Sequence, residues 1–158
     1  MAGKTLFFYG SLREKPLLAA VIGHGVEGLR FQAAEAQGYR VVHYPGRVYP
    51  ALAEVPGEAA PGIAVSGLSA ADVAALDVYE GNEYVRRPIS LEAGEEPLTA
   101  EAYRPTIAIP ADAPAWDYDT FRKTHGAALD LGTGQTPEAL RVQLEGLKPD
   151  KGGQDGGG

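Results

Sequence analysis

The feature that most constrains the fold is the apolar stretch from Leu6 to Tyr9, which is followed at once by Gly10 and Ser11. Four apolar or aromatic residues in a row are typical of a strand that is buried on both faces. A glycine at the end of such a strand lets the chain turn and lets a ligand approach the backbone closely. The amides of Gly10, Ser11 and Leu12 would then be free to hold a carboxylate or an oxyanion. The alternative is a purely structural turn, because a strand, a Gly-Ser turn and a helix occur together in many folds.

Length and composition predict a single domain. A chain of 158 residues, 44% of them hydrophobic, is long enough to bury one sizeable core, which we place in residues 1–147. Residues 148–158 form a Gly-rich polar tail with nothing to bury, and we expect it to be disordered. The apolar runs are too short to span a bilayer and no signal-like segment opens the chain, so we expect a cytoplasmic protein.

Charge and residue types argue against several partners and sites. The formal net charge of −7 disfavours nucleic acid or an anionic membrane surface as a partner. The absence of cysteine excludes disulfides, thiolate metal sites and a cysteine nucleophile. The histidines, His24, His43 and His125, are scattered along the chain with no carboxylate at ligand spacing. We therefore interpret them as surface or loop residues and expect no metal.

Two common catalytic motifs are missing from the sequence. The segment around Ser11 lacks the flanking glycines of a nucleophile elbow, which gives a hydrolase triad little support. No Gly-rich phosphate loop with a lysine is present. What remains is one backbone anion site and one candidate carboxylate, described below.

The first half of the chain is predicted to contain strands and one short helix. The helix covers Lys15–Ile22 and ends at Gly23, since glycine is common just past a helix end. An acidic segment rich in Pro and Gly, residues 54–61, is expected to be irregular. Strands are expected at residues 26–39, 41–44 and 63–68.

The second half is predicted to hold a hairpin and short helices. The hairpin joins residues 84–92 to residues 98–103 through a turn that starts at Gly94. A short helix is expected over residues 118–124. The last helix has Thr136 as its N-cap and a proline at its first position, and it ends near Gly146.

The best-defined helix lies between Ser69, a good N-cap, and Gly81. Val73, Leu76 and Glu80 share one face by the i, i+3, i+7 rule, so a carboxylate occupies the core-facing stripe in the last turn. Burial and the negative end of the helix dipole would both raise its pKa, which suits a general base near neutral pH. The alternative is that Glu80 turns outward into solvent.

Three segments of the chain are informative together: Tyr9-Gly10-Ser11-Leu12, Leu76-Asp77-Val78-Tyr79-Glu80-Gly81 and Tyr84-Val85-Arg86. In this order they resemble the γ-glutamylcyclotransferase family, in particular its bacterial and plant AIG2-like branch. Two further features, Tyr49-Pro50-Ala51-Leu52 and the strand pair that ends at Tyr103, occur in the family's order. The resemblance covers about residues 6–103, and the Gly-Ser-Leu turn lacks the tryptophan that follows it in the glutathione-specific branch.

The resemblance implies an α+β fold: a small mixed β-barrel of about six strands with peripheral helices. It also implies that a γ-glutamyl group on an amine or amino acid is cyclised to 5-oxoproline, releasing the amine. Glu80 would move the protons, and no metal or cofactor would be needed. The substrate-binding residues implied are Tyr9, Gly10, Ser11, Leu12 and Tyr84.

Other functions stay open at this level. A non-catalytic barrel that binds a small carboxylate, as a sensor or partner domain, would keep the same pocket, although such a binder gains nothing from an acid beside an anion site. Hydrolysis or transfer of another amide through an activated water is a third possibility. The expected partner is a small γ-glutamyl compound, and the expected state is a monomer or homodimer.

Overall fold

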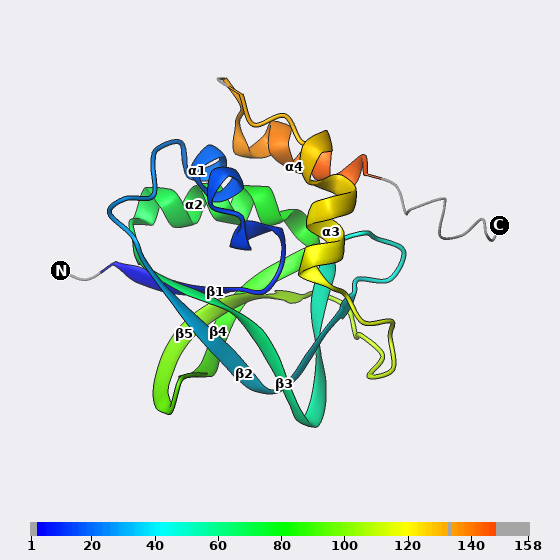
Figure 1. Cartoon of the computed structure of the whole chain (residues 1–158). Helices are drawn as coiled ribbons and strands as arrows, with labels where there is room; N and C mark the ends of the chain where they lie inside the picture. The colour runs from blue at the N-terminus through cyan, green and yellow to red at the C-terminus, as the bar shows by residue number, and fades with distance from the viewer. Residues whose placement is uncertain (1–2, 133, 148–158) are drawn as a thin grey trace.

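The computed structural model describes residues 3–132 and 134–147, which form an α+β fold (Figure 1). The strands close into a mixed barrel in the order β1-β3-β2-β4-β5, with β1 and β5 paired in parallel. The strands are β1 (Lys4–Phe8), β2 (Arg30–His43), β3 (Pro50–Leu68), β4 (Tyr84–Ala93) and β5 (Glu96–Pro105). The α-helices are α1 (Lys15–Ile22), α2 (Ala70–Glu80), α3 (Tyr118–His125) and α4 (Pro137–Glu145).

The described residues contain five strands, not about six, because segments expected to be separate are continuous. Residues 26–39 and 41–44 were expected as two strands, but β2 is one continuous strand over Arg30–His43, and residues 26–29 and Tyr44 lie outside it. Residues 54–61 were expected to be irregular, but they belong to β3, which has 19 residues. The long β2–β3 hairpin shifts register between Gln37 and Tyr39, where Gly38 and Gly57 both have positive φ. The Pro and Gly residues therefore form a bulge that bends the hairpin around the small barrel.

The first strand is buried on both faces, as its apolar run predicts. Leu6 and Phe8 belong to the core between the barrel and the helices, whereas Phe7 belongs to the core inside the barrel. All three side chains are at most 3% exposed. β1 therefore lies between the two cores, and the turn at Gly10 and Ser11 follows directly after it.

The predicted helices are confirmed, with bounds close to those expected. α1 ends at Gly23, whose φ is +81°. α2 begins with a complete capping box between Ser69 and Asp72 and is followed by Gly81. α4 has the expected Thr136 cap, with its proline at the first position. Helix ends are set by local backbone bonding, so a short sequence window is enough to place them.

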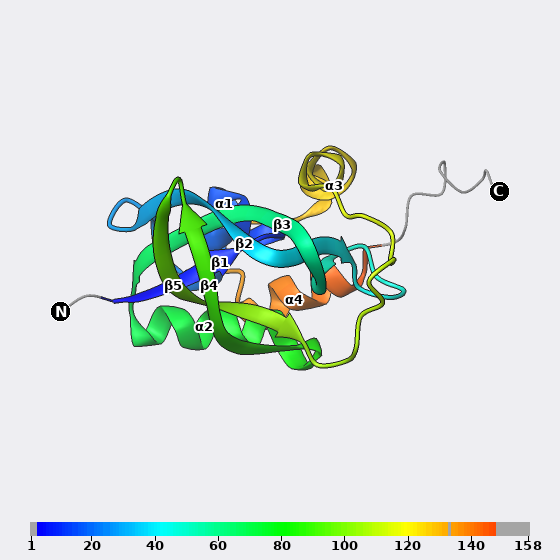
Figure 2. The ribbon, with the colours of Figure 1, turned by 90° about the horizontal axis from the view of Figure 1, so that it is seen from below.

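The helices are unevenly distributed around the barrel. α2 packs against both α1 and α4 on one side, and α3 lies apart from them (Figures 1 and 2). Trp116, just before α3, is 7% exposed, packs on Phe121 and donates an Nε1–H hydrogen bond to the Val48 carbonyl. No described helix has the length and apolarity needed to cross a membrane. The tail expected to be disordered, residues 148–158, lies outside the described residues.

Candidate active site

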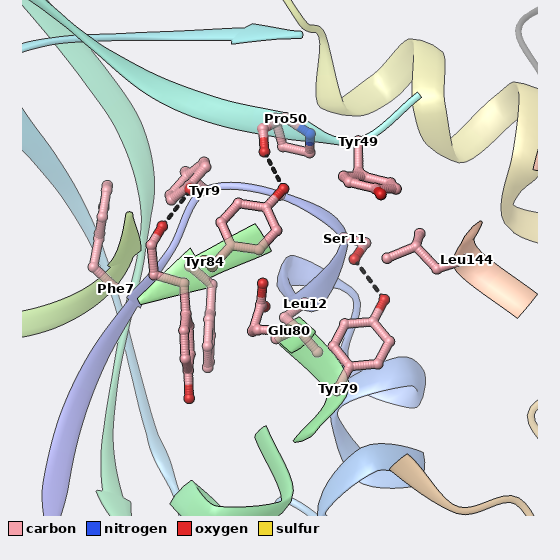
Figure 3. A pocket seen from close by; sticks show the side chains of 13 residues that line it. Phe7, Tyr9, Ser11, Leu12, Tyr49, Pro50, Tyr79, Glu80, Tyr84 and Leu144 are labelled. Carbon is pink, nitrogen blue, oxygen red and sulfur yellow. Dashed lines mark hydrogen bonds between the residues drawn. The ribbon is translucent and has the colours of Figure 1, made fainter. Parts of the chain in front are cut away.

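A pocket lies where the turn after β1 meets the C-terminal end of α2 (Figure 3). It contains about 390 Å³ of free space, including the part open to solvent. All six residues selected from the sequence line it: Tyr9, Gly10, Ser11, Leu12, Glu80 and Tyr84. The other lining residues are Phe7, Phe8, Tyr49, Pro50, Tyr79, Tyr103 and Leu144.

Glu80 ends α2 and turns its carboxylate into the pocket, toward Tyr84 and Leu12 (Figure 3). Among the described residues, none forms a hydrogen bond or ion pair with this carboxylate. Burial raises the pKa of Glu80 to about 8; the Arg141 guanidinium opposes the rise and the Asp77 carboxylate adds to it. The outward orientation considered above is therefore not adopted, and Glu80 can take up and release a proton near neutral pH.

The turn after β1 presents three backbone amides that have no partner within the described part of the chain. The chain forms a 3₁₀ turn over Ser11–Arg13, in which the Gly10 and Ser11 carbonyls accept from the two residues that follow Leu12. The amides of Gly10, Ser11 and Leu12 precede these bonds and stay free for a ligand.

Gly10 is required by space and not by backbone conformation, which corrects part of the sequence argument. Its φ is −126°, outside the left-handed region that favours glycine. A Cβ atom at this position would lie 2.8 Å from Cγ of Pro50, at the start of β3. Glycine therefore lets β1 and β3 approach closely beneath the turn.

The Ser11 hydroxyl is paired with a tyrosine hydroxyl and not with a base. Its Oγ lies 3.0 Å from the hydroxyl of Tyr79. Burial raises the pKa of that hydroxyl well above its usual value, so Tyr79 stays protonated at neutral pH. This environment does not activate Ser11 as a nucleophile.

Tyr9 and Tyr84 form walls of the pocket and are fixed by backbone acceptors. The Tyr84 hydroxyl donates to the Pro50 carbonyl and the Tyr9 hydroxyl donates to the Tyr103 carbonyl, both at 2.5 Å. Burial raises the pKa of both phenols. Their hydroxyl protons are thus occupied, and the faces and edges of their rings shape the space beside Glu80.

Sequence reasoning missed a polar network at the rim of the pocket. Arg141 of α4 is 7% exposed and pairs with Glu83, just after α2, at 2.5 Å. Glu83 also accepts a hydrogen bond from the Tyr49 hydroxyl and pairs with Arg47 at 3.0 Å. No local signal links these residues, because Arg141 follows Glu83 by 58 positions.

The histidines take no part in the pocket. His24 is on the surface and pairs with Asp72 through Nε2, at 2.7 Å, a contact that its sequence spacing does not suggest. His43 approaches the Arg47 carbonyl through Nδ1, at 3.2 Å. No three His, Asp or Glu side chains in the described ranges are grouped to hold a metal ion. The expectation of no metal and no cofactor stays a prediction.

Together these features define a small α+β barrel protein. Its pocket combines a carboxylate, Glu80, that has no hydrogen-bond or ion-pair partner among the described residues with a turn whose backbone amides are available to a ligand. A profile of the family described as "Gamma-glutamyl cyclotransferase, AIG2-like" matches residues 6–120, nearly three quarters of the chain. The chain belongs to this family, whose members are usually cyclotransferase enzymes. The resemblance found in the three sequence segments is thereby confirmed. No curated protein sequence matches the chain significantly.

Solved structures share the fold at low sequence identity. The solution structure of a protein from Arabidopsis thaliana is 23% identical with a TM-score of 0.65, over 81% of this chain and 77% of that one. A γ-glutamyl cyclotransferase is 15% identical with a TM-score of 0.60, over 95% and 90% of the two chains. An AIG2-like protein from Mus musculus is 18% identical with a TM-score of 0.54, over 68% and 80%. At these identities the likeness shows the fold alone.

Proposed function

We propose that the protein is a γ-glutamyl cyclotransferase that converts a γ-glutamyl amine or γ-glutamyl amino acid to 5-oxoproline and the free amine. The observation that carries the proposal is the Glu80 carboxylate, which lies in the pocket without a partner among the described residues and has a pKa of about 8. A pKa near 8 is much closer to that of an amino group than to that of an ordinary glutamate, so a proton passes readily between the two.

In the proposed reaction Glu80 moves one proton in each direction. Its carboxylate accepts a proton from the substrate's α-amino group, and the nitrogen attacks the substrate's own γ-carbonyl carbon. A new C–N bond closes the five-membered ring, and the carbonyl oxygen becomes an oxyanion. The Glu80 carboxyl then donates its proton to the departing nitrogen. The oxyanion returns to a carbonyl as the original C–N bond breaks, and 5-oxoproline and the free amine are released.

The turn after β1 supplies the complementary part of the mechanism. The free amides of Gly10, Ser11 and Leu12 would bind the substrate carboxylate or the developing oxyanion, which is costly to leave unpaired in a buried pocket. Because the attack is intramolecular, the protein provides no nucleophile. The aromatic walls formed by Tyr9 and Tyr84 would fold the substrate into the attacking conformation.

The proposal is tested by incubating the protein with a panel of γ-glutamyl dipeptides and γ-glutamyl amines and measuring 5-oxoproline directly by mass spectrometry. We expect 5-oxoproline and the free amine in equal amounts. The matched control is the corresponding α-glutamyl dipeptide, whose γ-carboxyl carries no amine to release. Free glutamate in place of 5-oxoproline would indicate hydrolysis by water and overturn the proposal. Binding of 5-oxoproline without turnover of any substrate would leave a carboxylate-binding protein.

A further inference from the structure

The C-terminal helix α4 forms one side of the pocket, although it lies beyond residue 120, where the family match ends. Leu144 of α4 lines the pocket and lies near Ser11 (Figure 3). One turn earlier on the same helix, Arg141 is buried at the junction of α4 with the end of α2. The site is thus completed by a helix that carries none of the three family segments.

Arg141 contacts the residues on both sides of Glu80. Its Nη1 donates to the carbonyl of Tyr79, the residue before Glu80, at 3.3 Å. A Cβ at Gly81, the residue after Glu80, would lie 3.2 Å from Nε of Arg141, and Gly81 also has a φ of +73°. Glycine therefore both ends α2 and leaves room for the guanidinium, which lies against the negative end of the helix dipole.

The guanidinium is itself held in place from several directions. It pairs with Glu83 through Nη2 and with Glu145 through Nε, at 2.5 Å and 2.8 Å. It also lies over the ring of Tyr49, 5.0 Å from the ring centre. A side chain fixed by this many contacts can in turn fix the backbone on either side of Glu80.

Arg141 also provides a positive charge among groups that disfavour a charged Glu80. The Asp77 carboxylate, one turn earlier on α2, makes ionisation of Glu80 harder, and the Arg141 guanidinium makes it easier. The Glu83 carboxylate pairs with Arg141, which offsets its charge. The other titratable groups that line the pocket with Glu80 are five phenols. Tyr79, Tyr84 and Tyr103 belong to α2, β4 and β5, whereas Tyr9 directly follows β1 and Tyr49 directly precedes β3.

We propose that Arg141 is a positioning residue for Glu80: it holds the end of α2 against α4 and sets a positive charge beside the pocket, so that Glu80 faces the substrate and releases its proton. This inference rests on the proposed function, in which Glu80 must be deprotonated to begin the reaction. Helix α4 then has a role in proton transfer by Glu80 as well as a role in packing the core.

The test compares three variants by the pH dependence of kcat. Arg141→Met removes the charge, Arg141→Lys keeps it, and Leu140→Ala weakens the packing of α4 at a core residue that does not line the pocket. We expect Arg141→Met to move the acidic limb up by about one pH unit, lowering turnover near pH 7 about tenfold, with recovery at higher pH. The acidic limb of Arg141→Lys should lie closer to that of the wild type. Leu140→Ala should lower Tm and leave the acidic limb of kcat at the same pH as in the wild type.

A purely structural role predicts a different result. In that case Arg141→Met would lose activity by the same factor at every pH, as Leu140→Ala would, and the inference would be overturned. An unchanged limb in Arg141→Met would overturn it as well. If Arg141→Met does not fold, Arg141→Gln compared with Arg141→Lys tests the same loss of charge.

A second measurement separates this inference from the proposed function. Titration of the Glu80 carboxyl by ¹³C NMR, assigned with Glu80→Gln, reports its pKa without any substrate. If the wild type releases no 5-oxoproline, the proposed function fails, and the titration still decides whether Arg141 acts on Glu80. If the wild type cyclises substrate but Glu80 titrates at the same pH in Arg141→Met, the inference fails and the proposed function stands.

Discussion

The hydroxyl of Tyr103 donates a hydrogen bond to Oδ1 of Asp77 at 2.6 Å, which ties β5 to α2 one helical turn before Glu80. Arg86 of β4 pairs with the same carboxylate at 3.0 Å. The Arg86 guanidinium and the Tyr103 hydroxyl hold the pKa of Asp77 below its usual range, so Asp77 is charged at neutral pH. A fixed negative charge therefore lies close to Glu80, and its effect on the pKa of Glu80 is opposite to that of Arg141.

Removing the negative charge of Asp77 should shift the pH profile of kcat in the direction opposite to the shift expected for Arg141→Met. In Asp77→Asn the repulsion of the Glu80 carboxylate is lost and Arg86 keeps its positive charge, so the pKa of Glu80 should fall. We expect the acidic limb of kcat to shift down by about half to one pH unit. The measurement is the rate of 5-oxoproline release against pH; an upward shift would contradict the electrostatic account.

Glu80→Gln should abolish proton transfer while leaving the pocket in place. We expect turnover to fall by at least ~10²-fold, the usual scale for loss of a general acid–base residue, with 5-oxoproline binding retained. Product formation is measured by mass spectrometry and binding by calorimetry. The matched control is Glu95→Gln, an exposed glutamate in the β4–β5 turn, which should keep full activity. Full activity in Glu80→Gln would remove Glu80 from the mechanism.

The raised pKa of Glu80 also predicts how stability depends on pH. In the unfolded chain this carboxyl ionises near its ordinary value of 4.5, whereas in the folded protein it keeps its proton up to about pH 8. The folded state therefore binds the proton more tightly, and the contribution of Glu80 to stability declines as pH rises from about 4.5 to about 8. Glu80→Gln removes this decline, so its Tm should equal or exceed that of the wild type at pH 8. Chemical denaturation at pH 5 and pH 8 measures the difference.

Glu83 behaves differently from Glu80, although the two are three residues apart. From sequence alone Glu83 serves as a neutral control, since it lies past the end of the helix. In the structure it pairs with Arg141 and Arg47, and its hydrogen bonds to Tyr49 and Arg47 lower its pKa. Its contribution to stability is therefore present above about pH 4.5 and is lost as pH falls below that.

The structure accordingly predicts that Glu83→Gln is destabilising. The change removes one of the two carboxylates that pair with the buried Arg141 guanidinium and leaves Glu145 as the other. We expect a loss of about 1–3 kcal/mol at pH 7, measured by urea unfolding. The loss should shrink as the pH falls through the lowered pKa of Glu83, where the wild-type carboxyl takes up a proton. A Glu83→Gln protein as stable as the wild type at pH 7 would show that water replaces the ion pair without cost.

The parts of the fold that the sequence predicts are those set by local chemistry. Helix α1, the Ser69 cap of α2 and the Thr136 cap of α4 depend on a few adjacent residues, and all were placed correctly. The 19-residue strand β3 was not, because the Pro and Gly residues in its middle resemble a loop. They are held in the sheet by pairing with β2, which no short window contains.

The same division applies to the candidate site. Glu80 was found from helical periodicity, and Gly10, Ser11 and Leu12 from the break in an apolar strand; both signals span fewer than ten residues. Arg141 carries no such signal, since an arginine in a short amphipathic helix is usually a solvated surface residue. Its burial follows from the packing of α4 on α2, a contact between elements distant in sequence.

The turn after β1 allows a test of whether its backbone or the side chain of Ser11 does the binding. Ser11→Ala keeps the amide and loses a hydroxyl bonded to Tyr79, so we expect less than a threefold change in kcat/KM. Gly10→Val should weaken 5-oxoproline binding severely, because its Cβ would meet the Pro50 ring. Circular dichroism should show the fold retained in both variants.

A double variant separates this steric cause from a general disturbance of the turn. Gly10→Ala places a Cβ where Cγ of Pro50 would lie 2.8 Å away and Cδ 3.2 Å away, and Pro50→Ala removes both ring atoms. We expect Gly10→Ala alone to weaken 5-oxoproline binding by about tenfold or more, and the Gly10→Ala, Pro50→Ala protein to recover most of it relative to Pro50→Ala. The opposite ranking, with Ser11→Ala inactive and the Gly10 variants active, would point to a serine nucleophile. The chemistry would then be acyl transfer through Ser11, and the backbone amides would have no part in holding the substrate.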